Sequence, residues 1–127
     1  MTEEKIRLGE LQLKILKVLW QRGEASVSEV HDDLGDSESL AYTTVATMLR
    51  KMEARDLVSH RTVGRKFIYA AAIEEAAVSK SLAHDVLDKV FEGSLSNMVH
   101  HLLTTRDVDA KELRRLEELI EKKKSST

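Results

Sequence analysis

The chain has 127 residues, a length that fits one domain of ordinary size or a small domain followed by an oligomerisation segment. Hydrophobic residues make up 42% and charged residues 33%, a balance that excludes a disordered chain. There is no proline and there are only five glycines, so we predict a mainly helical protein. The absence of cysteine excludes disulfides, thiolate metal sites and a cysteine nucleophile.

The charge is distributed unevenly along the chain. Residues 39–70 hold six Lys and Arg against two Asp and Glu, a local net of +4 in a chain whose net charge is -2. Such a local concentration can act on a polyanion even where the average charge is negative. No apolar run approaches the roughly 18 residues that span a bilayer, and the acidic start MTEE differs from a signal peptide. We therefore expect a cytoplasmic protein without membrane insertion.

Three amphipathic helices and a β-hairpin are predicted in the first half of the chain. Apolar residues recur every three or four positions in three segments, 10–22, 26–34 and about 41–54, with a polar linker at 36–39. The second of these helices begins with the spacing of a capping box, Ser26 to Glu29. Residues 57–62 and 66–70 are instead rich in β-branched and aromatic side chains, and Gly64 lies between them as in a hairpin turn.

The second half is predicted to be helical throughout, at residues 74–91, 94–105 and from Asp109 onwards, with a frayed end at 122–127. These short helices cannot easily bury their own apolar stripes, so we expect mutual burial across a two-fold axis. The residues expected to form this dimer core are Val86, Val90, Val99, Leu102, Leu103, Leu116 and Ile120.

The order helix–helix–helix–hairpin, with its basic residues on the third helix and the hairpin, is typical of a winged helix-turn-helix. A recognition helix presents short polar side chains at its N-terminal end, where it enters the major groove of DNA. Thr43, Thr44 and Thr47 share such a face, and we expect them to contact base edges. Phosphate contacts are expected from Ser39, Tyr42, Arg50, Lys51, Arg61, Arg65 and Lys66.

The predicted fold class is therefore mainly α with a small β-hairpin. Residues 1–72 form an N-terminal winged-helix DNA-binding domain, and residues 73–127 form a C-terminal helical dimerisation region. Because two linked heads bind two half-sites at a raised effective concentration, separating the C-terminal helices should release DNA. We expect induction to work in this way.

Four blocks in order along nearly the whole chain resemble the penicillinase repressor family (BlaI/MecI/CopY). They are LKVLW at 16–20, TTVATML at 43–49, GRKFIY at 64–69 and GSLSNMV at 93–99. The resemblance implies a homodimeric transcriptional repressor whose winged helix binds an inverted-repeat operator in double-stranded DNA. It also implies base contacts at the start of the third helix, which carry over to Thr43, Thr44 and Thr47.

The resemblance also bears on how such a repressor is induced. In antibiotic-responsive members of the family, a sensor protease leads to cleavage within the dimerisation helices at an Asn–Phe bond. That bond aligns with His101–Leu102 in this chain, where both residue types differ. The copper-responsive branch uses a C-terminal cysteine motif, which this chain lacks.

Two other classes of function compete with a repressor. A winged helix can serve as a protein–protein interaction module without specific DNA binding, and exposed apolar residues on the third helix and hairpin would favour that reading. An enzyme is not expected, because the chain has no glycine-rich phosphate loop and no nucleophile with an evident base. The five histidines lack the spacing of metal ligands, so we expect neither a metal nor a cofactor.

Overall fold

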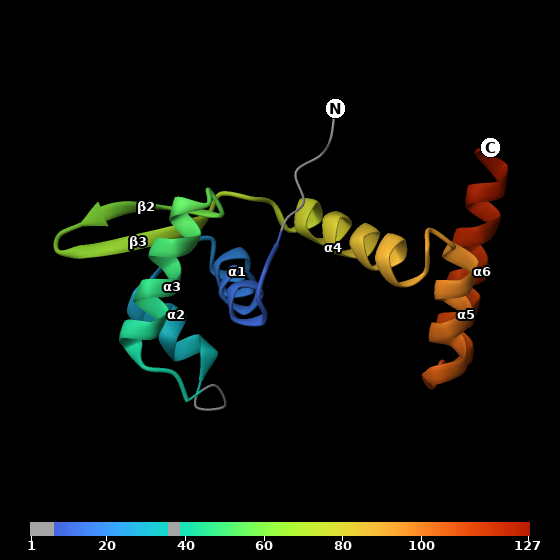
Figure 1. Cartoon of the computed structure of the whole chain (residues 1–127), viewed down its shortest axis with the longest axis horizontal. Coiled ribbons are helices and arrows are strands. Elements are labelled where there is room, and N and C mark those ends of the chain that lie inside the picture. Colours follow the sequence, from blue (N-terminus) through green and yellow to red (C-terminus); the bar gives the residue numbers. More distant parts are fainter. Residues whose placement is uncertain (1–6, 36–38) are drawn as a thin grey trace. The chain divides into compact units, whose positions relative to one another are not determined.

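The computed structural model describes residues 7–35 and 39–127 and divides into two compact units between Ala83 and His84. Its elements (Figure 1) are α1 (Glu10–Arg22), β1 (Ala25–Ser26), α2 (Val27–Leu34), α3 (Tyr42–Ala54), β2 (Val58–Val63), β3 (Lys66–Ala71), α4 (Glu75–Val90), α5 (Leu95–Thr105) and α6 (Ala110–Ser125). The acidic N-terminus and the linker residues 36–38 lie outside the described residues. The predicted fold class, mainly helical with a small antiparallel sheet, is confirmed.

Helices α1, α2 and α3 pack together in the first unit, because each carries an apolar stripe at helical spacing. Their bounds agree with the predicted ones to within about one residue. The hairpin of β2 and β3 extends from these helices (Figure 1). The buried side chains that form the core are Ile15, Leu16, Val18, Leu19, Ala25, Val30, Leu34, Val45, Leu49, Met52, Leu57, Val58 and Tyr69.

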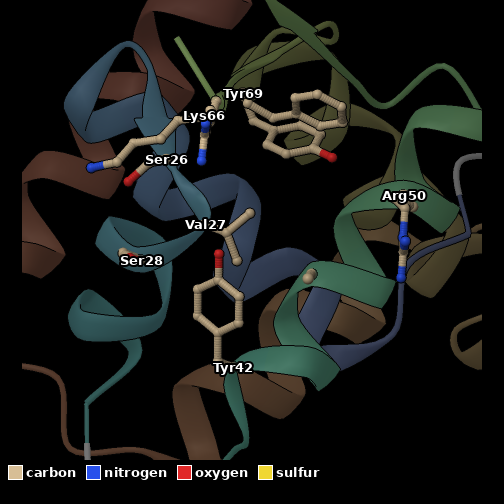
Figure 2. Close-up of a pocket in the computed structure, with 10 residues that line it drawn as sticks. Ser26, Val27, Ser28, Tyr42, Arg50, Lys66 and Tyr69 are labelled. Atoms are coloured by element: carbon tan, nitrogen blue, oxygen red, sulfur yellow. The ribbon is translucent and has the colours of Figure 1, made fainter. Parts of the chain in front are cut away.

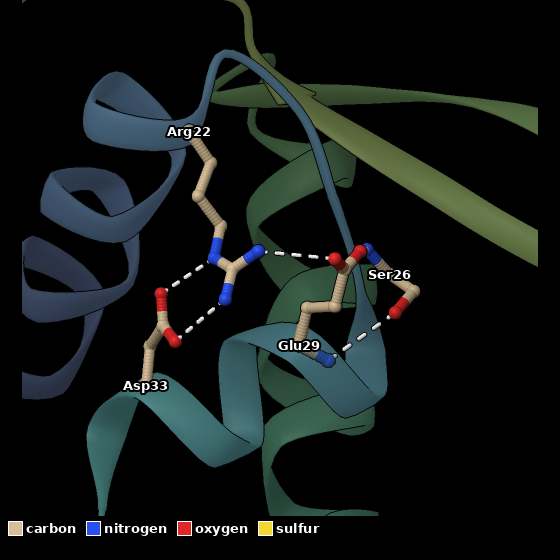
Figure 3. A network of polar contacts seen from close by, with 4 residues as sticks. All are labelled: Arg22, Ser26, Glu29 and Asp33. Carbon is tan, nitrogen blue, oxygen red and sulfur yellow. Dashed lines mark hydrogen bonds and ion pairs between the residues drawn. The ribbon is translucent and has the colours of Figure 1, made fainter.

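A polar network joins the end of α1 to the start of α2 (Figure 3). Ser26 Oγ accepts a hydrogen bond from the Glu29 amide at 3.2 Å, and Glu29 Oε1 accepts one from the Ser26 amide at 2.9 Å, which confirms the capping box. Arg22 donates from Nε and Nη2 to the two oxygens of Asp33 at 2.6 and 2.8 Å, and from Nη1 to Glu29 at 3.0 Å. The guanidinium hydrogen bond holds the pKa of Asp33 below its usual value, while the Ser26 amide does most to lower the pKa of Glu29.

The sheet has the strand order β1-β3-β2, and both neighbouring pairs are antiparallel. Gly64 and Arg65 form the turn between β2 and β3, and Gly64 has a φ of 62°, which glycine adopts without steric cost. The sequence does not predict β1, because two residues are too few to show the alternation of a strand. Its pairing of Ala25 with Tyr69 ties the hairpin to the chain between α1 and α2.

In the unit formed by residues 84–127, α5 and α6 each begin at a residue whose side chain caps the helix. Ser94 Oγ accepts from the Asn97 amide at 3.2 Å, and Asp109 Oδ1 accepts from the Glu112 amide at 2.8 Å. Helix α6 continues to Ser125, so the predicted fraying is wrong for residues 122–125. The lysines of its last turn stabilise the helix end, because their positive charges lie near the negative end of the helix dipole. The two compact units divide at 83/84, whereas a domain boundary at 72/73 stays a prediction.

Candidate nucleic-acid interface

Helix α3 buries one face and exposes the other. The three threonines expected to read bases, Thr43, Thr44 and Thr47, are all exposed. The apolar residues of the opposite face are buried in the core. Arg50 lies one turn after Thr47 and donates from Nη2 to its Oγ1 at 3.4 Å. The structure thus places a cation beside the polar face of the helix.

The hairpin of β2 and β3 (residues 58–71) is called the wing below. A groove of about 270 Å³ lies between the start of α2, helix α3 and the wing (Figure 2). Four of the residues predicted to contact phosphate line it: Tyr42 and Arg50 from α3, and Arg65 and Lys66 from the hairpin. In the described part of the chain, no carboxylate is among the lining residues, so the lining is positively charged. This is the combination of side chains that a polyanion requires.

The groove also includes residues that sequence reasoning does not assign, namely Ser26, Val27, Ser28, Ala46, Phe67 and Tyr69. Ser28 lies in the first turn of α2, where backbone amides have no partner within the helix and favour anions. Phe67 and Tyr69 are alternate residues of β3 and therefore share one face of the strand. That alternation is a signal by which the sequence could have placed them together, whereas the approach of α2 depends on tertiary packing.

Tyr69 belongs to the hydrophobic core and also lines the groove. Its side chain is 1% exposed, and burial raises the pKa of the phenol, with a smaller contribution from the nearby charge of Glu53. The hydroxyl therefore keeps its proton at neutral pH and can donate a hydrogen bond.

Three of the predicted phosphate residues do not line the groove. Ser39 is exposed before α3 with a φ of 48°, and Lys51 is exposed on α3 one turn after Thr47. Arg61 donates to Glu24 from Nε at 3.1 Å and from Nη2 at 2.5 Å. This pair lowers the pKa of the Glu24 carboxyl and raises that of the Arg61 guanidinium.

Arg61 lies on the face of the hairpin opposite to that of Phe67 and Tyr69. In the register of β2 and β3, Arg61 is opposite Ile68, whereas His60 is opposite Tyr69. Because successive side chains of a strand point to opposite faces, Arg61 points away from the face that carries Phe67 and Tyr69. Lys66 is two residues from Ile68 on β3 and shares that face, so what distinguishes Arg61 from Lys66 is its pairing with Glu24 and its absence from the groove lining.

The second unit exposes the apolar residues expected to form a dimer core. Val90 is 66% and Ile120 52% exposed, and neither α5 nor α6 has a buried residue. Six of the seven residues predicted for the dimer core are exposed and one, Leu116, is half-buried; the exposed ones are Val86, Val90, Val99, Leu102, Leu103 and Ile120. A groove of about 560 Å³ between α5 and α6 is lined by the apolar residues Val99, Leu102, Leu103, Val108 and Leu116 and by the charged residues Arg106, Asp107, Asp109 and Glu112. Leu95, Leu113 and Leu119 add exposed apolar surface beyond the residues expected to form the dimer core.

Among residues 7–35 and 39–127, no three His, Asp or Glu side chains gather closely enough to hold a metal ion. No helix in the described ranges combines the length and the apolar character needed to cross a bilayer.

Three helices and a hairpin, followed by a helical C-terminal region, define a winged helix-turn-helix protein. The family model described as "Penicillinase repressor" matches residues 8–122, and the chain belongs to the penicillinase repressor family. It is similar to the penicillinase repressor of Bacillus licheniformis, with 24% identity over 119 residues, 94% of this chain and 93% of that protein. It is 38% identical over 65 residues to the transcriptional regulator BlaI of Mycobacterium tuberculosis, which covers 50% of this chain and 47% of that protein. The family is one of transcriptional repressors rather than enzymes.

Proposed function

We propose that the protein is a homodimeric repressor that binds an inverted-repeat DNA operator through α3 and the wing. The observation that carries this proposal is the positively charged groove beside the exposed threonine face of α3. An α-helix fits the major groove, and Thr43, Thr44 and Thr47 offer hydroxyls and methyl groups to base edges. With the helix seated there, the cations of the groove reach the phosphates that flank the contacted bases.

The proposed phosphate ligands have different support from the structure. Tyr42, Arg50, Arg65 and Lys66 line one groove and act together. Ser39 precedes α3 and Lys51 lies in its second half; both are exposed, and we assign them to neighbouring phosphates. Arg61 instead ties the wing to the loop before β1 through Glu24, and its charge is shared with that carboxylate. We therefore assign Arg61 to holding the wing rather than to DNA.

The proposed dimer follows from the apolar faces of the second unit. Val90, Leu95 and Ile120 are exposed in the single chain. A partner that covered them would stabilise the complex by about 25 cal/mol for each Å² of apolar surface removed from water. A second copy offers the same surface, and a two-fold axis makes such a surface complementary to itself. Two heads joined in this way bind an inverted repeat with an avidity that one head lacks.

Induction is proposed to act by separating the two copies. A sensor protease acting at or near His101–Leu102 would meet this bond inside α5, where the His101 carbonyl accepts hydrogen bonds from Thr104 and Thr105 at 3.1 and 2.7 Å. Cleavage there requires this helix to unwind first. Leu102 also lines the groove between α5 and α6, so a cut at this bond would break the proposed dimer surface.

The test is binding of the purified protein to its own upstream DNA and to a random duplex at two salt concentrations. Tight, salt-sensitive binding with a clear preference for an inverted repeat is the expected result. Equal and weak binding to both duplexes would contradict a repressor. It would favour the alternative, a winged-helix interaction module, for which the exposed side chains of Val63 and Phe67 on the wing would be the first surface to examine.

A further inference from the structure

The C-terminal part of α3 is joined to the wing by one side-chain pair. His60 on β2 donates from Nδ1 to the carboxylate of Glu53 on α3, at 2.7 Å from Oε1 and 2.8 Å from Oε2. The side chains are 28% and 33% exposed, so the pair is partly shielded from water. Within residues 7–35 and 39–127, no other side-chain hydrogen bond links α3 to the hairpin.

The same histidine is stacked on the aromatic side chains of the groove. The ring of His60 lies over that of Phe67, with centroids 4.1 Å apart and planes at 20°, and its centroid is 5.5 Å from that of Tyr69. The antiparallel register explains this contact, because His60 is opposite Tyr69 and diagonal to Phe67 on one face of the sheet. Phe67 and Tyr69 line the groove, so His60 connects Glu53 of α3 to the aromatic residues of the groove.

We propose that Glu53 and His60 are positioning residues that set the distance between the wing and the recognition helix. This inference rests on the proposed DNA binding of α3 and the wing. A two-stranded hairpin is marginally stable by itself, so contacts with its neighbours determine where its turn lies. The hydrogen bond and the ring stack hold the wing where Arg65 and Lys66 reach phosphates while α3 occupies the major groove.

The consequence for binding can be separated from a loss of folding. A wing that is fixed in advance binds without losing conformational freedom, so the bridge should raise affinity by preorganisation. Each phosphate contact contributes about 0.9 to the slope of log K against log salt. If the wing moves away, the two wing cations lose their contacts, and the slope falls by about one to two.

The matched variants are Glu53→Ala and Glu53→Gln. Both remove the same negative charge, but only Glu53→Gln keeps an oxygen that can accept from His60 Nδ1. We expect Glu53→Ala to bind the operator roughly tenfold more weakly than Glu53→Gln, with a slope lower by about one to two. His60→Phe keeps a ring over Phe67 but cannot donate to Glu53, and it should reproduce the lower slope.

The full-length variants should be compared by fluorescence anisotropy with operator and random duplexes over a range of salt concentrations, well below their melting temperatures. Equal affinities and slopes for Glu53→Ala and Glu53→Gln, with wild-type protein that prefers the operator, would overturn the positioning role and leave the proposed function standing. Wild-type protein that binds both duplexes equally would overturn specific operator binding, while the two slopes on the random duplex would still test the bridge. Binding to neither duplex would overturn both.

Discussion

Lys66 and Arg61 are cations of the same hairpin, but their surroundings give them different roles. Lys66 lines a groove whose described lining residues include no carboxylate, whereas Arg61 does not line this groove and donates to Glu24. An exposed ion pair of this kind adds little to stability. The Glu24 carboxylate nevertheless offsets the positive charge of Arg61, which would otherwise attract a phosphate. The local environment of each cation, rather than its place in a basic stretch, therefore decides whether DNA can use it.

Replacing Lys66 tests this difference directly. Lys66→Ala should weaken binding to operator and random duplexes alike, because a phosphate contact carries no sequence information, and should lower the salt slope by about one. Anisotropy titrations over a range of salt concentrations measure both quantities. Lys17→Ala removes an exposed lysine from α1, outside the groove, and should leave both unchanged. A change in the preferred sequence on replacing Lys66 would contradict its role as a phosphate ligand.

At the scale of elements, Arg22 holds α1 and α2 together through two acidic side chains. Asp33 receives two of its hydrogen bonds, and Glu29 receives one in addition to that from the Ser26 amide. The start of α2 lines the DNA-facing groove, so this network also fixes one wall of the proposed interface. A link made of carboxylates depends on their ionisation.

The network predicts that the protein loses stability in acid. The pKa values of Asp33 and Glu29 are lowered in the folded state, so the unfolded chain takes up protons first as the pH falls. This stabilisation is fully present above the unfolded values, near pH 4, and is lost as the pH drops through the lower folded values. We expect the urea midpoint to fall below about pH 4, measured by circular dichroism from neutral to acidic pH.

Arg22→Gln provides the comparison that isolates the guanidinium. It removes the hydrogen bonds to Asp33 but keeps the capping box of Ser26 and Glu29. The difference in midpoint between wild type and this variant should be largest at neutral pH and should shrink in acid. Arg114→Gln, at an exposed position of α6, is the matched control and should follow the wild-type profile. A difference that stays constant with pH would show that Arg22 acts through packing alone.

Local patterns predict the elements of this protein well, and contacts between distant side chains poorly. The helical spacing of Ile15, Leu19, Val45 and Leu49 and the caps at Ser26 and Asp109 arise within a few residues, so the bounds of α1, α2 and α3 follow from the sequence. The pairs Arg61–Glu24 and His60–Glu53 depend on how a hairpin lies against other elements, which no periodicity records. The threonine face and four of the ten residues that line the groove are likewise predicted from the sequence. The contribution of α2 to the groove emerges only in three dimensions.

At the scale of the whole molecule, the two units divide the proposed work. The first has a well-buried core and carries the charged groove, while the helices α5 and α6 of the second bury no residue in a single chain. An apolar surface of this kind marks an interaction site in a stable protein. The proposed dimer gives that surface a partner and gives the two heads a fixed linkage. DNA affinity and self-association should therefore change together.

Leu102→Lys tests this linkage, because it replaces one of the apolar side chains that line the groove between α5 and α6 with a charged one and leaves the first unit unchanged. Burying an unpaired ammonium in a dimer interface is strongly unfavourable, so the variant should sediment as a monomer of 14.4 kDa. Loss of the second head should weaken binding to the inverted repeat by about a hundredfold. Binding to a single half-site should stay unchanged, because α3 and the wing are intact.

The matched control is Thr105→Lys, which adds the same charge at an exposed position of α5 outside the groove. This control should stay dimeric and bind the inverted repeat as tightly as wild type, because its ammonium remains in water. A Leu102→Lys variant that is still dimeric would place the interface elsewhere on the second unit. A monomeric variant that binds the inverted repeat with undiminished affinity would instead show that one head suffices, which would remove the physical basis for induction by separating the helices.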